Sequence, residues 1–165
     1  MSGPSHARET PIHDHRLLAA TLEGGCKPVS EWRIGTEHEK FGFYLPDRAG
    51  DPALALRPPP YEGEHGIGAL LEGIAALGWN RIEEHGRLIA LSRDGASVTL
   101  EPAGQLELSG APLETIHQTC CETTRHLNEV REVADPLGIG FLGMGFQPKW
   151  ARGDMPWMPK GRYRI

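Results

Sequence analysis

The stretch that most constrains the fold runs from Arg33 to Phe43 and reads Arg-Ile-Gly-Thr-Glu-His-Glu-Lys-Phe-Gly-Phe. Side chains of a β-strand alternate between two faces, so a strand here places Glu37 and Glu39 side by side on one face. Residues two apart on a strand lie roughly 6.5 to 7 Å from each other, within reach of one cation or of two neighbouring cations. Two like charges are costly to desolvate unless a cation or a titration partner compensates them. This strand, expected over about Glu31 to Leu45, therefore needs one face that is open to water or to a cation.

The composition is that of a single soluble globular domain and excludes several classes of protein. The chain has 165 residues, 24% of them charged and 39% hydrophobic, with a formal net charge of -5. Without a Lys and Arg cluster before the last few residues, nucleic acid is not the expected partner. Neither a signal peptide nor a run of apolar residues long enough to span a membrane is recognisable, so we expect a cytoplasmic protein. Cys26, Cys120 and Cys121 have no C-x-x-C spacing and are interpreted as reduced thiols.

Local patterns predict several helices and strands behind a flexible tail over residues 1–12. Helical periodicity and capping residues indicate three helices, over His13 to Leu22, Gly66 to Leu77 with Gly78 as its C-terminal cap, and Pro112 to Ala134 ended by Asp135-Pro136. An Asp-Gly pair between two apolar runs is a strong hairpin signal. Besides the strand with the paired glutamates, we therefore expect strands at Leu88 to Leu91, Ser97 to Leu100, Gln105 to Ser109 and Ile139 to Phe146.

This order of elements lacks the regular alternation of a parallel sheet and includes a hairpin. We therefore predict an α+β fold with helices on one face of a largely antiparallel sheet and carboxylates on the other. The longest helix is expected to face the sheet with one stripe of side chains: Leu113, Ile116, Cys120, Leu127, Val130 and Val133. Cys120 and Cys121 are expected to pack in the core.

Four glutamates, each on or beside a predicted strand, are the candidate metal ligands: Glu37, Glu39, Glu101 and Glu107. Carboxylate oxygens at this density suit Mg²⁺ or Mn²⁺, which typically bridge protein carboxylates and nucleotide phosphates. The alternative is a solvated acidic face. His38 points to the opposite face and is interpreted as structural. The C-terminal segment is basic, which fits either anion recognition or a solvated loop.

Several motifs resemble one known family over nearly all of the chain from residue 30 onward. They are Arg33-Ile-Gly-Thr-Glu-His-Glu-Lys-Phe-Gly-Phe, Leu100-Glu-Pro-Ala-Gly-Gln-Leu-Glu-Leu-Ser-Gly-Ala-Pro-Leu-Glu-Thr-Ile-His-Gln-Thr-Cys, Gly138-Ile-Gly-Phe-Leu-Gly-Met-Gly-Phe-Gln-Pro-Lys-Trp and Met158-Pro-Lys-Gly-Arg-Tyr. In order and spacing they resemble the glutamate-cysteine ligases of plants and proteobacteria.

The resemblance implies a catalytic domain related to glutamine synthetase, with a curved antiparallel sheet, of which residues 13–165 form an incomplete N-terminal part. It also implies ATP-dependent joining of the γ-carboxyl of L-glutamate to the amine of L-cysteine through a γ-glutamyl phosphate, the first step of glutathione synthesis. By similarity, Glu37, Glu39, Glu101 and Glu107 would hold Mg²⁺. Lys160, Arg162 and Tyr163 would lie near the amino-acid pocket. The oligomeric state, the base and the nucleotide-site residues stay open.

The family enzymes are longer than this chain, so the resemblance also implies that these residues alone have little or no ligase activity. Two alternatives remain. One is a related carboxylate-amine ligase with another amine substrate, and the other is a non-catalytic binding module that retains the sheet.

Overall fold

A computed structural model describes residues 11–47 and 51–164, so most of the predicted tail, residues 1–10, lies outside the described part. The helices are α1 (Arg16–Glu23), α2 (Ile67–Ala76) and α3 (Ile116–Leu137). The strands are β1 (Glu37–Tyr44), β2 (Asn80–Glu84), β3 (Arg87–Arg93), β4 (Ala96–Leu100), β5 (Leu106–Ser109) and β6 (Ile139–Leu142). Short 3₁₀ turns join several of these elements.

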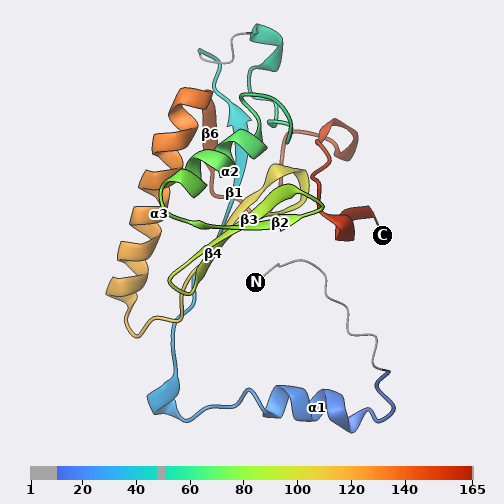
Figure 1. The fold of residues 1–165 in the computed structure, drawn as a ribbon, viewed down its shortest axis with the longest axis vertical. Helices are drawn as coiled ribbons and strands as arrows, with labels where there is room; N and C mark the ends of the chain where they lie inside the picture. The colour runs from blue at the N-terminus through green and yellow to red at the C-terminus, as the bar shows by residue number, and fades with distance from the viewer. Residues whose placement is uncertain (1–10, 48–50, 165) are drawn as a thin grey trace.

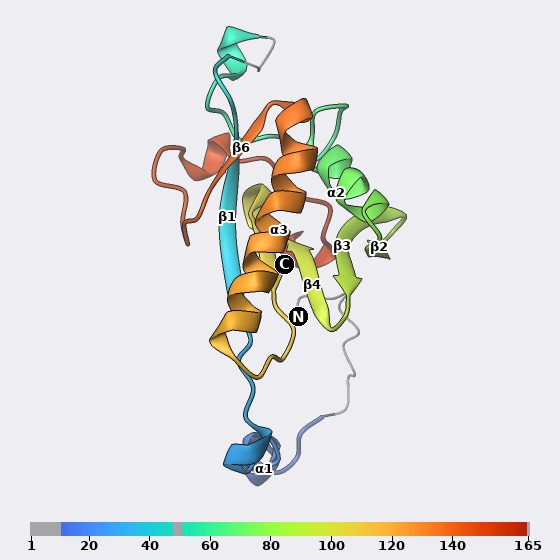
Figure 2. The same ribbon diagram turned by 90° about the vertical axis from the view of Figure 1, so that its left-hand side faces the viewer.

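The strands form one six-stranded sheet in the order β2-β3-β4-β5-β1-β6, and each neighbouring pair is antiparallel. Helices α2 and α3 pack against each other and cover one face of this sheet (Figures 1 and 2). The α+β prediction is therefore confirmed. Strands β1 and β6 are the first and the last along the chain, and they pair with each other. Segments far apart in the sequence therefore lie side by side at one edge of the sheet.

The sheet face under the helices is largely apolar. The register aligns Leu91 of β3 with Val98 of β4, and Val98 with Leu108 of β5, and all three side chains are completely buried. They join Ile67, Leu70 and Leu71 of α2 in a single core cluster. Burying this surface drives the association of the helical layer with the sheet.

The Asp-Gly hairpin is confirmed. Asp94 and Gly95 both have positive φ, 51° and 84°, as a two-residue turn with the twist of the flanking strands requires. A second such turn, His85-Gly86 with φ of 52° and 73°, joins β2 to β3. Strand β2 was not predicted from the sequence, because it is charged and largely exposed, as edge strands commonly are.

Helix α3 begins and ends later than predicted. Thr115 is the N-cap residue and shares a capping box with Gln118, so Pro112 lies before the helix. Pro136 lies inside the last turn and does not end the helix, which stops at Gly138 in the left-handed conformation with φ of 70°.

The predicted buried face of α3 was only partly right. Val130 is buried as predicted, and Leu113 and Val133 pack against the core, but the other predicted positions are exposed. The side chains that α3 buries are Thr119, Glu122, His126, Val130 and Ala134. By contrast Ile116 is 64% exposed, Leu127 is 40% exposed, and Cys120 and Cys121 are exposed free thiols, so the cysteines do not pack in the core. The predicted set of positions and the buried set both have helical spacing, and the buried set is the more polar of the two. The face of α3 toward the sheet is thus partly hydrophilic.

The remaining differences concern the ends of the chain. Helix α1 buries none of its residues and lies away from the sheet at the end of an extended segment (Figure 1). Strand β1 starts at Glu37 rather than near Glu31, and β6 ends at Leu142 rather than at Phe146. Among residues 11–47 and 51–164, no helix has the length and hydrophobicity needed to cross a lipid bilayer.

Candidate functional site

A row of polar side chains crosses the sheet on the face away from α2 and α3. Glu39 of β1 lies directly opposite Glu107 of β5, and Glu107 lies opposite Thr99 of β4. Directly opposed residues have Cβ atoms about 4.5 to 5.5 Å apart. Along β1, Glu37 lies opposite Ser109, so it extends the same acidic face. The sheet therefore brings Glu37, Glu39 and Glu107 together, as the alternation of their strands predicted.

Neutral donors orient these carboxylates. Gln105 Nε2 donates to Glu39 Oε2 at 3.0 Å, and Ser109 Oγ donates to Glu107 Oε1 at 2.7 Å. The Thr99 hydroxyl lies 3.2 Å from Glu101 Oε1 and 3.5 Å from Glu107 Oε2 and can donate to either. An amide or hydroxyl fixes a carboxylate in space without cancelling its charge. These contacts leave the acidic face negatively charged.

The carboxylates of Glu37, Glu39 and Glu107 partly match the ligands that a hard cation prefers. Hard divalent ions such as Mg²⁺ prefer carboxylate oxygens. In the described part of the chain, Glu37, Glu39 and Glu107 form no ion pair with Lys or Arg. Among those same residues, however, no three acidic, His or Cys side chains converge as a ready-made metal site. Since Mg²⁺ is commonly held by one or two carboxylates together with substrate phosphates, a pair of opposed glutamates still fits it.

Glu101 is differently placed. Its side chain is buried, with Oε1 3.2 Å from Lys160 Nζ and Oε2 2.5 Å from Arg162 Nη2. Tyr163 OH lies 2.9 Å from Glu101 Oε2 and can donate to it. Burial alone would raise the pKa of Glu101, but Lys160, Tyr163 and Arg162 together hold it below its ordinary value. Glu101 is an ionised carboxylate that already has two cationic partners, and its role as a metal ligand stays a prediction.

The predicted substrate-binding residues therefore meet at one of the predicted metal ligands. We refer to Glu101, Lys160, Arg162 and Tyr163 as the Glu101 cluster. Lys160 is only 2% exposed, and burial lowers its pKa despite the nearby Glu101. Burial also raises the pKa of Tyr163, so its hydroxyl stays protonated and can donate. No local pattern in the sequence could have predicted this contact between residues about sixty positions apart.

Among the described residues, several hollows lie along the acidic face, and two of them bear on the candidate site. One, of about 480 Å³, is lined by Arg162 and Tyr163 together with the aromatic residues Trp150 and Trp157. The other, of about 490 Å³, lies between Glu37 and Glu39 on one side and the glycine-containing segment 143–145 on the other. The Cβ that a side chain at Gly145 would add lies 3.7 Å from Glu39 Oε2. A side chain at this position would therefore be in van der Waals contact with the Glu39 carboxylate.

Lys40, on the opposite face of β1 from the glutamates, was not among the residues singled out from the sequence. Its side chain is 1% exposed and its Nζ donates to the carbonyl oxygen of His38 at 3.2 Å. Burial lowers the pKa of Lys40 to about 7, although Glu107 acts in the opposite direction. His38 faces the helices with Lys40, as predicted. Alternation along β1 assigns Lys40 to this face, but only the cross-strand register with Leu106 reveals that the position is buried.

Comparison with known proteins gives a consistent result. Residues 33–165 match the model of glutamate-cysteine ligase family 2. The chain is 54% identical over 145 residues to the chloroplastic glutamate-cysteine ligase of Medicago truncatula, covering 87% of this chain and 26% of that protein. It is 52% identical over 149 residues to the chloroplastic glutamate-cysteine ligase A of Oryza sativa subsp. japonica, covering 90% of this chain and 28% of that protein. The chain thus spans about a quarter of the length of these relatives.

The names of the relatives bear on the predicted cytoplasmic location. The proteins compared, including the one from Arabidopsis thaliana, are named as chloroplastic. The predicted cytoplasmic location was therefore wrong. It depended on the failure to recognise a targeting segment, and such a failure does not determine a compartment.

Proposed function

Since this chain belongs to glutamate-cysteine ligase family 2, we propose that it supplies part of the active site of an ATP-dependent ligase. The ligase would join the γ-carboxyl of L-glutamate to the amine of L-cysteine. Because the chain spans about a quarter of its relatives' length, we assign this activity to a polypeptide of their size. The observation that carries the proposal is the pair of opposed glutamates, Glu39 and Glu107. They lie on an accessible face beside the Glu101 cluster.

The reaction needs an activated carboxyl group, because a carboxylate is a poor electrophile. In the proposed course, an oxygen of the γ-carboxylate attacks the γ-phosphorus of ATP and ADP leaves, which yields γ-glutamyl phosphate. The amine nitrogen of cysteine then attacks the acyl carbon, loses a proton and expels inorganic phosphate. Bound Mg²⁺ would neutralise phosphate charge, as it does in phosphoryl transfer generally.

The residues of this chain have distinct roles in that course. Glu37, Glu39 and Glu107 are the residues that would hold Mg²⁺, and the donors Gln105 and Ser109 keep two of these carboxylates oriented. Glu101 was also predicted to be a metal ligand. It would bind the metal ion only if its carboxylate contacted the ion and its present partners, Lys160 and Arg162, at the same time.

The Glu101 cluster supports binding of an anionic substrate. Arg162 is 39% exposed at the side chain and lines the adjacent hollow, so its guanidinium can also reach a carboxylate placed there. Lys160 is buried and holds the segment against the sheet. Lys160 therefore positions Arg162 and Tyr163, whereas Arg162 is the group available to a substrate carboxylate.

The test is ADP release by the full-length protein that contains this chain. Release that requires both L-glutamate and L-cysteine supports the proposal. Release that requires glutamate and a different amine identifies a related carboxylate-amine ligase. Absence of any ATP cleavage in a correctly folded full-length protein contradicts the proposal and favours a non-catalytic module. The 165-residue chain assayed alone is expected to show little or no turnover.

A further inference from the structure

The two strands that carry the glutamates of the acidic face are joined by hydrogen bonds where β1 begins and β5 ends. Glu37, the first residue of β1, pairs with Ser109, the last residue of β5. One residue further out, the backbone N–H of Gly110 donates to the carbonyl oxygen of Thr36 at 2.6 Å. This junction also bears on Glu107, because the Ser109 hydroxyl donates to Glu107 Oε1 at 2.7 Å. The position of the Gly110 backbone therefore affects both Glu37 and Glu107.

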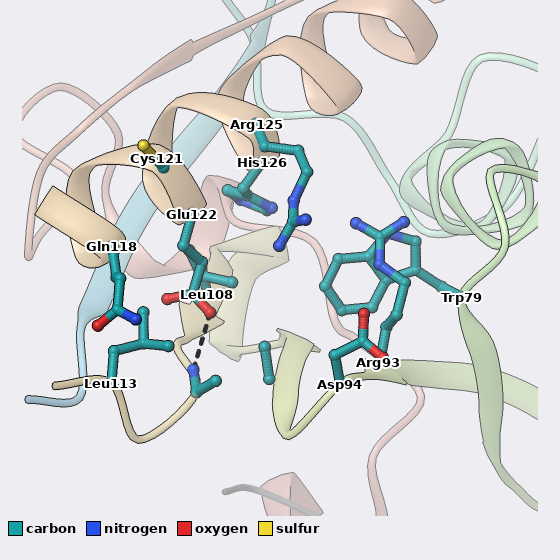
Figure 3. A pocket seen from close by; sticks show the side chains of 12 residues that line it. Trp79, Arg93, Asp94, Leu108, Leu113, Gln118, Cys121, Glu122, Arg125 and His126 are labelled. Atoms are coloured by element: carbon teal, nitrogen blue, oxygen red, sulfur yellow. Dashed lines mark hydrogen bonds between the residues drawn. The ribbon is translucent and has the colours of Figure 1, made fainter. Parts of the chain in front are cut away.

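A buried side chain of α3 contacts this junction from the other face of the sheet. Glu122 lies in the wall of a cavity of about 290 Å³ beneath α3, and it is only 7% exposed. Its Oε1 accepts the backbone N–H of Ala111 at 2.9 Å, the contact drawn as a dashed line in Figure 3. Its Oε2 faces Gly110 so closely that a Cβ added to this glycine would collide with it. The two carboxylate oxygens thus contact two consecutive residues of the segment that leaves β5.

Stability alone does not explain a carboxylate at this position. Sheet-facing positions of a helix normally hold apolar side chains, and burying a carboxyl group is costly unless its oxygens have partners. Among residues 11–47 and 51–164, Glu122 forms no ion pair, and its Oε2 accepts no hydrogen bond. An apolar residue would avoid this cost but could not accept the Ala111 N–H. What the carboxylate adds is a fixed position for the Gly110-Ala111 segment.

We propose that Glu122 is a positioning residue for the metal site. It holds the Gly110-Ala111 segment, and this segment sets where Glu37 and Ser109 lie at the end of the acidic face. Ser109 in turn orients Glu107. The inference rests on the proposed function, in which the acidic face holds a divalent cation. Removing a group that orients metal ligands without touching the metal typically weakens metal binding by roughly 10- to 100-fold.

The test compares two substitutions of Glu122 in the full-length protein that contains this chain. Glu122→Asp keeps the carboxylate but shortens the side chain, so it no longer reaches the Ala111 N–H unless the backbone moves. Glu122→Gln removes the charge but keeps the length and an accepting oxygen. Mn²⁺ affinity is measured from the paramagnetic resonance signal of free Mn²⁺. Glu122→Asp should bind Mn²⁺ at least about tenfold more weakly than the wild type, whereas Glu122→Gln should stay within about threefold of it.

Two further variants separate positioning from stability. Val130→Ala is the matched control, because Val130 is a core residue of the same helix, 3% exposed, whose side chain cannot hold a backbone group. It should lower the free energy of unfolding and leave Mn²⁺ affinity unchanged. Gly110→Ala disturbs the same junction from the strand side, since its methyl group would displace the Glu122 carboxylate. It should weaken Mn²⁺ binding at least about tenfold. Circular dichroism checks folding, and Gly110→Ala decides the question if Glu122→Asp is unfolded.

Three results overturn the inference while the proposed function stands. Wild-type Mn²⁺ affinity in folded Glu122→Asp or Gly110→Ala would mean that Glu122 only satisfies the Ala111 N–H. Equal weakening by Glu122→Gln and Glu122→Asp would assign the effect to charge, and equal weakening by Val130→Ala would assign it to a general loss of stability. A different result contradicts the metal site itself and this inference with it: no Mn²⁺ binding by the wild type, or wild-type affinity in both Glu39→Gln and Glu107→Gln.

Discussion

Replacing Glu101 with Gln tests how the C-terminal segment is held on the sheet. The variant removes the carboxylate that lies 3.2 Å from Lys160 Nζ and 2.5 Å from Arg162 Nη2. Lys160 is 2% exposed and would be left as a buried charge without its partner, whereas Arg162 can turn toward water. Breaking a buried ion pair from one side costs roughly 3 to 5 kcal/mol. We expect about 3 kcal/mol, near the lower end, because only one of the two cations is trapped.

The assay is thermal and urea unfolding. For a protein of this size a loss of 3 kcal/mol lowers the Tm by roughly 6 to 12 °C. Glu83→Gln is the matched control, since Glu83 pairs with Arg81 at 2.8 Å but both side chains are solvated, and it should change the Tm little or not at all. In Glu101→Gln/Lys160→Met most of the lost stability should return, because the stranded charge is gone. Equal effects of Glu101→Gln and Glu83→Gln would refute the reasoning.

Two further predictions concern other parts of the fold. The pKa of Lys40 is lowered by burial to about 7 from an ordinary 10.5, so between these values the unfolded state binds more protons than the folded state and stability should rise with pH. Unfolding measured from pH 7 to 10 should show this gain in the wild type but not in Lys40→Met, and parallel curves would contradict it. Thr115→Ala removes the capping box of α3 and should cost about 1 kcal/mol in urea unfolding, whereas Thr124→Ala, at an exposed position within the helix, should cost little or nothing; equal losses would show that the cap is unimportant.

Local patterns in the sequence predicted much of the fold because the relevant signals lie within a few residues. The Asp94-Gly95 turn, the helix before Gly78 and the alternation around Glu107 each depend on neighbouring residues alone. The charged strand β2 was missed, since its pairing with β3 supplies the stability that its own composition does not.

The candidate site was predictable only in part. Alternation placed Glu37, Glu39 and Glu107 on one face, and the register confirms that arrangement. The Glu101 cluster depends on contacts between distant segments, which no periodicity encodes. The face of α3 was predicted only in part, with Val130 buried as expected, because hydrophobicity was used to choose between two sets of positions with helical spacing. The structure instead buries polar side chains of α3, among them Glu122 and His126, which hydrophobicity does not select.

The central claim is that the acidic face holds the metal ion of a ligase. The most direct measurement is the affinity for Mn²⁺, together with ADP release, of full-length Glu39→Gln and Glu107→Gln, with Glu83→Gln as the control. Both site variants should remain folded, bind Mn²⁺ more weakly and lose about 100-fold or more of their activity, while the control stays unchanged. Wild-type Mn²⁺ affinity and activity in both site variants would contradict the account, and the row of glutamates would then be an ordinary solvated face.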